Sequence, residues 1–124
     1  MGIDIFTRWK GQATTESERQ HDAWLDPTAG RIGYLREAYH GEPYATHYFV
    51  PEVFEGGVAF IPAQTLRERL PETLRLAEKR EREIYRATTP EEIQPVLQSY
   101  IDFVELCERK EAETGEPMEI CAWW

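Results

Sequence analysis

Residues 39–48, YHGEPYATHY, place two of the chain's three histidines and three of its six tyrosines within ten residues. His40 and His47 lie on either side of a Gly-Glu-Pro turn. Two imidazoles and one carboxylate, from Glu37 or Glu42, with an open coordination position form a known ligand set for Zn²⁺ or non-haem Fe²⁺. Because no metal family requires this spacing, a small metal-assisted or acid–base enzyme at this turn is an alternative rather than the favoured interpretation.

The same segment also has the composition of a binding surface. Tyrosine combines a flat apolar ring with a hydroxyl group, as small-molecule pockets and protein interfaces do. Arg31 and Arg36 would hold an anionic group nearby, so a small-molecule binder that uses this aromatic pocket is a second alternative. Turn residues whose rings pack on the core would have the same composition. The candidate ligand- or partner-binding residues are Tyr34, Arg36, Tyr39, His40, Tyr44, His47 and Tyr48.

Few other residues suggest catalysis. His21 and Asp22 lie with Asp26 in the most polar stretch of the chain, where nothing would exclude water from a site. The sequence contains no GxSxG, P-loop, GxGxxG or HExxH motif. Cys107 has acidic neighbours, which raise the pKa of a thiol, and Cys121 has no basic neighbour in sequence. We therefore assign no catalytic residue, no metal ligand and no cofactor.

Composition narrows the class of protein. A chain of 124 residues favours one domain, 1–124. Its 23 acidic and 14 basic side chains give a net charge of −9, which argues against binding to nucleic-acid phosphates. No stretch approaches the ~18 apolar residues of a membrane helix, and the first residues lack the pattern of a signal peptide. With two cysteines outside any CxxC pair, we expect a reduced, cytoplasmic protein that binds no membrane.

The chain ends on two tryptophans, Trp123 and Trp124. Terminal residues fray unless they dock, and two indole rings are costly to leave in water. We expect at least one ring to pack on the body of the protein or in a subunit interface. Both are therefore candidate interface residues, and a homodimer that buries them is one expected arrangement.

The elements that position these residues begin with a strand at residues 2–9, where apolar and polar side chains alternate. Residues 11–30 are polar and predict a surface excursion that contains a short helix. We expect Trp24 and Leu25 to hold this excursion against the body. Residues 31–40 carry apolar side chains at helical spacing and predict a short helix.

Residues 45–61 predict a hairpin, because a β-branched and aromatic run precedes a Gly-Gly turn and a second apolar run. Pro51 would force an edge position or a bulge. Residues 63–87 and 90–114 carry the apolar stripes of two long helices. Pro71 predicts a kink in the first of them, or two helices that meet there.

The last residues, MEICAWW, alternate as a strand does. This order of elements predicts an α+β fold: a small, mostly antiparallel sheet that includes both terminal strands, with a short helix and two long helices from the C-terminal half packed on one face. The sequence favours a non-enzymatic binding or interaction module that acts through a protein partner or self-association.

Overall fold

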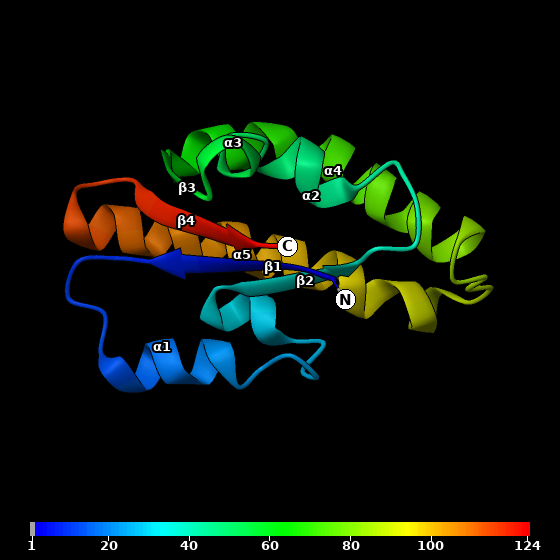
Figure 1. The fold of residues 1–124 in the computed structure, drawn as a ribbon, viewed down its shortest axis with the longest axis horizontal. Coiled ribbons are helices and arrows are strands. Elements are labelled where there is room, and N and C mark those ends of the chain that lie inside the picture. The colour runs from blue at the N-terminus through cyan, green and yellow to red at the C-terminus, as the bar shows by residue number, and fades with distance from the viewer. Residues whose placement is uncertain (1) are drawn as a thin grey trace.

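The computed structural model describes residues 2–124. Within them, four strands form one antiparallel sheet in the order β2-β1-β4-β3 (Figure 1). The strands are β1 (Gly2–Arg8), β2 (Tyr34–Ala38), β3 (Val58–Ile61) and β4 (Met118–Trp123). The two terminal strands, β1 and β4, both belong to the sheet, as predicted, and they lie side by side in its centre. Strands β2 and β3 form its two edges.

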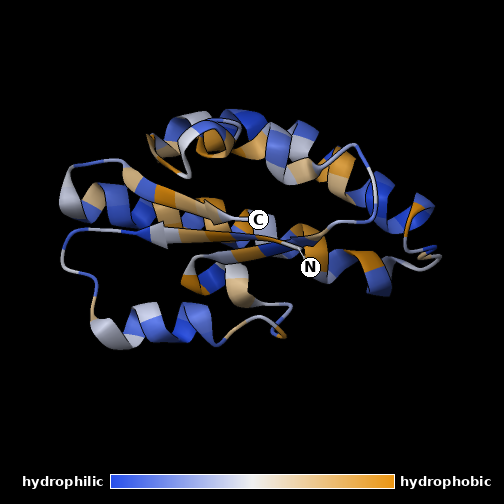
Figure 2. Ribbon diagram, viewed as in Figure 1, coloured by the Kyte–Doolittle hydropathy of each residue, from blue (hydrophilic) through white to orange (hydrophobic). Residues whose placement is uncertain are grey.

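Two long helices pack against each other and on one face of the sheet, which confirms the predicted α+β architecture (Figure 1). In Figure 2 apolar residues run along the strands, whereas α1 is largely hydrophilic. The helices are α1 (Thr14–His21), the 3₁₀ helix η1 (Ala29–Ile32), α2 (Ala45–Phe49), α3 (Val53–Gly56), α4 (Ala63–Glu83) and α5 (Pro90–Thr114).

The core lies between the inner face of the sheet and the long helices. Ile5 of β1 and Ile120 of β4 lie on this face, and both are fully buried in the same cluster as Leu66 of α4 and Phe103 of α5. Alternate residues of β1 and β4 point to the other face, because side chains of a strand alternate with a period of two. The sheet therefore has an inner face in the core and an outer face whose cover is incomplete.

The predicted helix at residues 31–40 is wrong, because most of this segment is strand β2. Gly33 adopts a left-handed backbone conformation, with φ of +88°, and ends η1 just before the strand. Residues Tyr34–Ala38 then pair in register with β1. Leu35 and Glu37 are buried on the inner face. Because Glu37 is polar although it faces inward, the segment lacks the alternation of apolar and polar side chains that identifies a strand.

The predicted strand at the start of 45–61 is also wrong. Residues Ala45–Phe49 form helix α2, and only Val58–Ile61 pairs as a strand, with β4 rather than in a local hairpin. Ala45 and Phe49 lie one helical turn apart and are both fully buried, so packing outweighs the β propensity of the sequence. Helix α4 runs continuously through Pro71.

The polar excursion at 11–30 is anchored by one buried polar side chain. The Gln20 amide nitrogen of α1 donates to the carbonyl oxygens of Thr7 and Ile32, each at 2.9 Å. The predicted anchors, Trp24 and Leu25, are instead exposed. A hydrogen-bonded amide thus holds α1 where apolar packing was expected.

Candidate functional site

A buried ion pair shapes the aromatic turn that the sequence singled out. The Nε atom of Arg80 lies 3.0 Å from the carboxylate of Glu37, and only 3% and 7% of the two side chains are exposed. The same guanidinium donates to the carbonyl oxygens of Ala38 at 2.9 Å, Pro43 at 3.1 Å and Gly41. Arg80 therefore fixes the path of the chain through the turn by binding its carbonyl groups.

Glu37 secures the helix that follows the turn. Its carboxylate accepts hydrogen bonds from the backbone amides of Ala45 at 2.8 Å and Thr46 at 3.1 Å, and from the Thr46 hydroxyl at 2.6 Å. Free amides at a helix start need such acceptors. With these bonds and Arg80, the carboxylate of Glu37 is occupied by structural partners.

The rings of the turn form part of an aromatic row along one side of the protein. The row runs from Tyr39 to Tyr44, His47, Phe54 and Trp124, with successive ring centroids 5.8, 4.9, 4.2 and 5.3 Å apart. Arg80 lies over the Tyr44 ring, 4.9 Å from its centroid. Tyr39, Tyr44 and Phe54 pack against the core. The row thus brings together three of the predicted binding residues and one predicted interface residue.

The other predicted turn residues lie apart from this row. His40 packs beside Tyr85, with ring centroids 5.3 Å apart, and Tyr48 is exposed. His40 and His47 consequently have different ring neighbours. Across residues 2–124, no group of three His, Cys, Asp or Glu side chains is placed to hold a metal ion.

His21 is the last residue of α1, and although it is exposed, its ring packs against the outer face of the sheet. Its ring centroid is 4.6 Å from that of Phe6 and 5.5 Å from that of Trp123. Phe6 also stacks on Tyr34 at 5.1 Å. Together with buried residues of the 22–30 segment, these rings cover the half of the outer face that β1 and β2 form.

The half of the outer face formed by β3 and β4 is open. Val58 pairs with Cys121 and Phe60 with Glu119, so Val58 and Phe60 share the outer face with these β4 residues. Large apolar side chains here remain in water: Val58 is 48% exposed, Phe60 66% and Trp123 56%. We call these three residues the outer β3–β4 surface.

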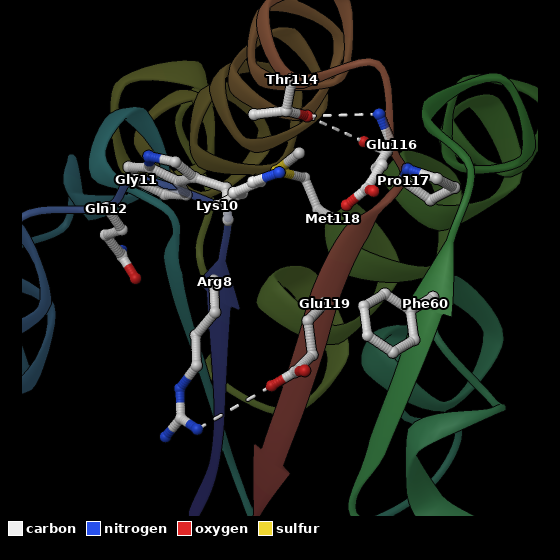
Figure 3. Close-up of a pocket in the computed structure, with 11 residues that line it drawn as sticks. Arg8, Lys10, Gly11, Gln12, Phe60, Thr114, Glu116, Pro117, Met118 and Glu119 are labelled. Carbon is white, nitrogen blue, oxygen red and sulfur yellow. Dashed lines mark hydrogen bonds and ion pairs between the residues drawn. The ribbon is translucent and has the colours of Figure 1, made fainter.

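Charges border the outer β3–β4 surface on one side. Figure 3 shows Arg8, Glu119 and Phe60 in one row across β1, β4 and β3. An Arg8 nitrogen lies 3.9 Å from a Glu119 oxygen, so the two charges offset each other. The adjoining hollow, which these residues line, has a volume of about 520 Å³. Trp124, which is 54% exposed, belongs to the aromatic row and not to this surface.

Strand β3 has a free edge. The Ala122 amide donates to the Gly57 carbonyl at 2.9 Å, which fixes the alternation of hydrogen bonds between β3 and β4. Because such bonds involve every second residue of an antiparallel strand, Ala59 and Ile61 bond to β4. The amides and carbonyls of Val58 and Phe60 point the other way and have no hydrogen-bond partner within residues 2–124.

The opposite edge of the sheet, strand β2, lines a groove that contains the remaining two predicted residues. Tyr34 donates to the Asp4 carboxylate, and burial, followed by this hydrogen bond, raises the pKa of Tyr34 to about 12. Arg36 lies 2.8 Å from the same Asp4 oxygen. The groove, about 370 Å³ in volume, continues to Trp24, Tyr85 and Tyr100.

Both cysteines are free and buried. Burial and, secondarily, the nearby Glu111 and Glu108 carboxylates raise the pKa of Cys107 far above its ordinary range. Burial likewise raises the pKa of Cys121. Neither thiol has the lowered pKa of a reactive cysteine.

Neither the outer β3–β4 surface nor the Tyr85 and Tyr100 side of the groove beside β2 was predicted from the sequence. Val58 and Phe60 were placed in a strand, but their exposure depends on β3 being an edge, which only the strand order determines. Tyr100 lies within the helix predicted at 90–114, and neither Tyr100 nor Tyr85 was singled out as a binding residue. The alternation VAFI was the only local signal that two large apolar side chains share a face.

No protein family model matches the chain, and neither a curated protein nor a solved structure is significantly similar to it. Among the residues described here, none of the helices combines the length and the apolar character that crossing a lipid bilayer requires.

Proposed function

We propose that this protein is a non-enzymatic interaction module that self-associates through strand β3 and the outer β3–β4 surface. The observation that carries the proposal is the coincidence of exposed Val58, Phe60 and Trp123 side chains with the unpaired backbone groups of Val58 and Phe60. A free strand edge is a template for another strand. Exposed apolar side chains beside it add affinity to such pairing.

A second copy of β3 fits this edge. In an antiparallel pair about Ala59, Val58 lies opposite Phe60 of the second copy, and the reverse pair follows by symmetry. The outward backbone groups then form about four new hydrogen bonds, each contributing about 0.5–1.5 kcal/mol. Pairs of an aromatic and a β-branched residue are favourable across strands. No charge lies within Val58–Ile61, so the strand contains no repulsive element against its own copy.

Net charge opposes this association at long range. Each chain carries a net charge of −9, and two such chains repel each other across water. Salt screens this repulsion over about 8–10 Å at physiological ionic strength, whereas apolar contacts persist. The dimer should therefore become tighter as salt increases, the opposite of a complex that ion pairs hold together.

The proposal is tested by measuring molar mass with light scattering after size-exclusion chromatography. The wild type is compared with Phe60→Lys across about 1 μM to 1 mM protein, a range that corresponds to binding free energies of about −8 to −4 kcal/mol. We expect the mass of the wild type to approach twice the 14.5 kDa of one chain. Phe60→Lys should remain monomeric, since a lysine on an edge strand blocks pairing.

Leu25→Lys is the matched control, because Leu25 is equally apolar and exposed but lies on another surface. It should dimerise as the wild type does. Circular dichroism must show that both variants keep the native fold. A wild type that stays monomeric over the whole range, or equal dimerisation of the Phe60 variant, would contradict the proposal.

A further inference from the structure

The groove beside β2 has a wide apolar part and a narrow polar part. The wide part, about 370 Å³, has Trp24, Leu25 and Pro27 on one side. The narrow part, about 80 Å³, extends toward Glu81 of α4. Both parts share the side chains of Tyr85 and Tyr100 among others, so the two hollows adjoin each other. This shape suits a ligand with a small polar group on an apolar stem.

The charges of the narrow part determine which polar group fits. Two arginines line it, but each already has a carboxylate partner: Arg80 pairs with Glu37 at 3.0 Å, and Arg36 with Asp4 at 2.8 Å. Glu81 forms no ion pair or side-chain hydrogen bond within residues 2–124 and is partly buried. Because the other charges offset one another, Glu81 leaves the narrow part with one uncompensated negative charge.

The Tyr100 side chain supplies a second unpartnered polar group. It is only 4% exposed, and its hydroxyl makes no hydrogen bond within residues 2–124. Within residues 2–124, every fully buried side-chain oxygen or nitrogen atom has a hydrogen-bond partner. The Tyr100 hydroxyl must therefore reach the surface of the groove that its side chain lines. A buried polar side chain with a free hydroxyl needs a partner from outside the chain or water.

From these observations we propose that the groove binds an organic cation, an alkylammonium group on an apolar stem. The ammonium group lies at the narrow end, where it donates to the carboxylate of Glu81 and the hydroxyl of Tyr100. A cation near aromatic rings is stabilised further by their electron-rich faces, and Tyr85 provides one at this position. The stem occupies the wide end beside Trp24 and Leu25. The amine of a free metabolite or a lysine side chain would present this chemistry.

The site is distinct from the proposed self-association surface. It lies at the β2 edge, whereas the outer β3–β4 surface lies at the other edge of the sheet. Binding of a cation in the groove does not depend on whether the protein dimerises. The two proposals therefore succeed or fail separately.

The test uses hexylammonium and hexanoate as probes of equal stem length and opposite charge, with binding followed by the chemical shifts of backbone amides. We expect saturable shifts with hexylammonium at residues of the groove and none with hexanoate. Glu81→Gln should weaken hexylammonium binding about tenfold or more, since it removes a charged hydrogen-bond acceptor. Tyr100→Phe should weaken it by a smaller factor.

Glu78→Gln is the matched control, because Glu78 is on the same helix, pairs with Arg82 and does not line the groove. It should bind hexylammonium as the wild type does. Saturable binding of hexanoate instead would show that the arginines attract an anion and would overturn the proposal. No binding of either probe, or equal binding by the Glu81 variant, would overturn it as well.

Discussion

Replacement of Arg80 by methionine should remove a large part of the stability of this protein. The Arg80 side chain is 3% exposed and contacts the Glu37 carboxylate and three carbonyl oxygens of the turn. Without it, Glu37 is left as a buried charge, and loss of one partner of such a pair typically costs about 3–5 kcal/mol. The total stability of a domain is about 5–15 kcal/mol. Arg80→Met should therefore unfold at much lower urea concentration than the wild type.

The assay is equilibrium unfolding in urea, monitored by tryptophan fluorescence and circular dichroism. Arg75→Met is the control on the same helix, because Arg75 forms an exposed pair with Glu72 and should cost less than about 1 kcal/mol. A double variant, Arg80→Met with Glu37→Gln, should recover part of the loss since no buried charge remains. A loss below about 1 kcal/mol in Arg80→Met would refute this account of the turn.

Three further outcomes follow from the structure. Gly33→Ala should destabilise the protein more than Gly115→Ala. Both glycines have positive φ, but only at Gly33 would an added Cβ lie 1.8 Å from the Thr7 hydroxyl oxygen. Equal losses of unfolding free energy in urea would contradict this prediction. Burial raises the pKa of Glu81, with Arg80 lowering it and Glu37 raising it to lesser degrees, so the folded protein loses stability as pH rises through this pKa. Glu81→Gln should consequently raise the melting temperature at neutral pH, and this gain should disappear below about pH 4. An unchanged or lower melting temperature of the variant at neutral pH would contradict the prediction. Cys107 should react with thiol reagents only at the rate of global unfolding, which mass spectrometry of the labelled protein can follow; fast labelling of the native protein would show that it is accessible.

The large features of the fold were predictable because each depends on a local pattern. Strand alternation at both termini and long apolar stripes after residue 62 led to an α+β architecture with both terminal strands in one sheet, and the structure confirms this. The wrongly predicted helix and strand lie between residues 31 and 50. In this segment Glu37 occupies one of the inward-facing positions of β2. A carboxylate is compatible with the core there because it pairs with Arg80, which lies 43 positions later in the chain. Single-sequence patterns do not contain such a long-range pair.

The candidate site depends less on local patterns than the fold does. Trp123 was chosen as a candidate interface residue because an indole ring is costly to leave in water, and in the monomer it is 56% exposed on an open sheet face. Phe60 was not identified, since its exposure results from the position of β3 at the edge of the sheet. His40 and His47 lie only seven positions apart in the sequence, but the turn that Arg80 organises gives them different ring neighbours. Tertiary contacts, rather than local spacing, determine which of these residues meet.

Hydrogen exchange of four amides in β3 tests the proposed self-association most directly. The amides of Ala59 and Ile61 bond to β4 in the monomer and should exchange slowly at any protein concentration. The amides of Val58 and Phe60 lie on the free edge, so they should exchange quickly in dilute solution and become protected as concentration rises. Fast exchange of Val58 and Phe60 at all concentrations, with Ala59 and Ile61 protected as internal controls, would show that the edge stays unpaired and would contradict the account.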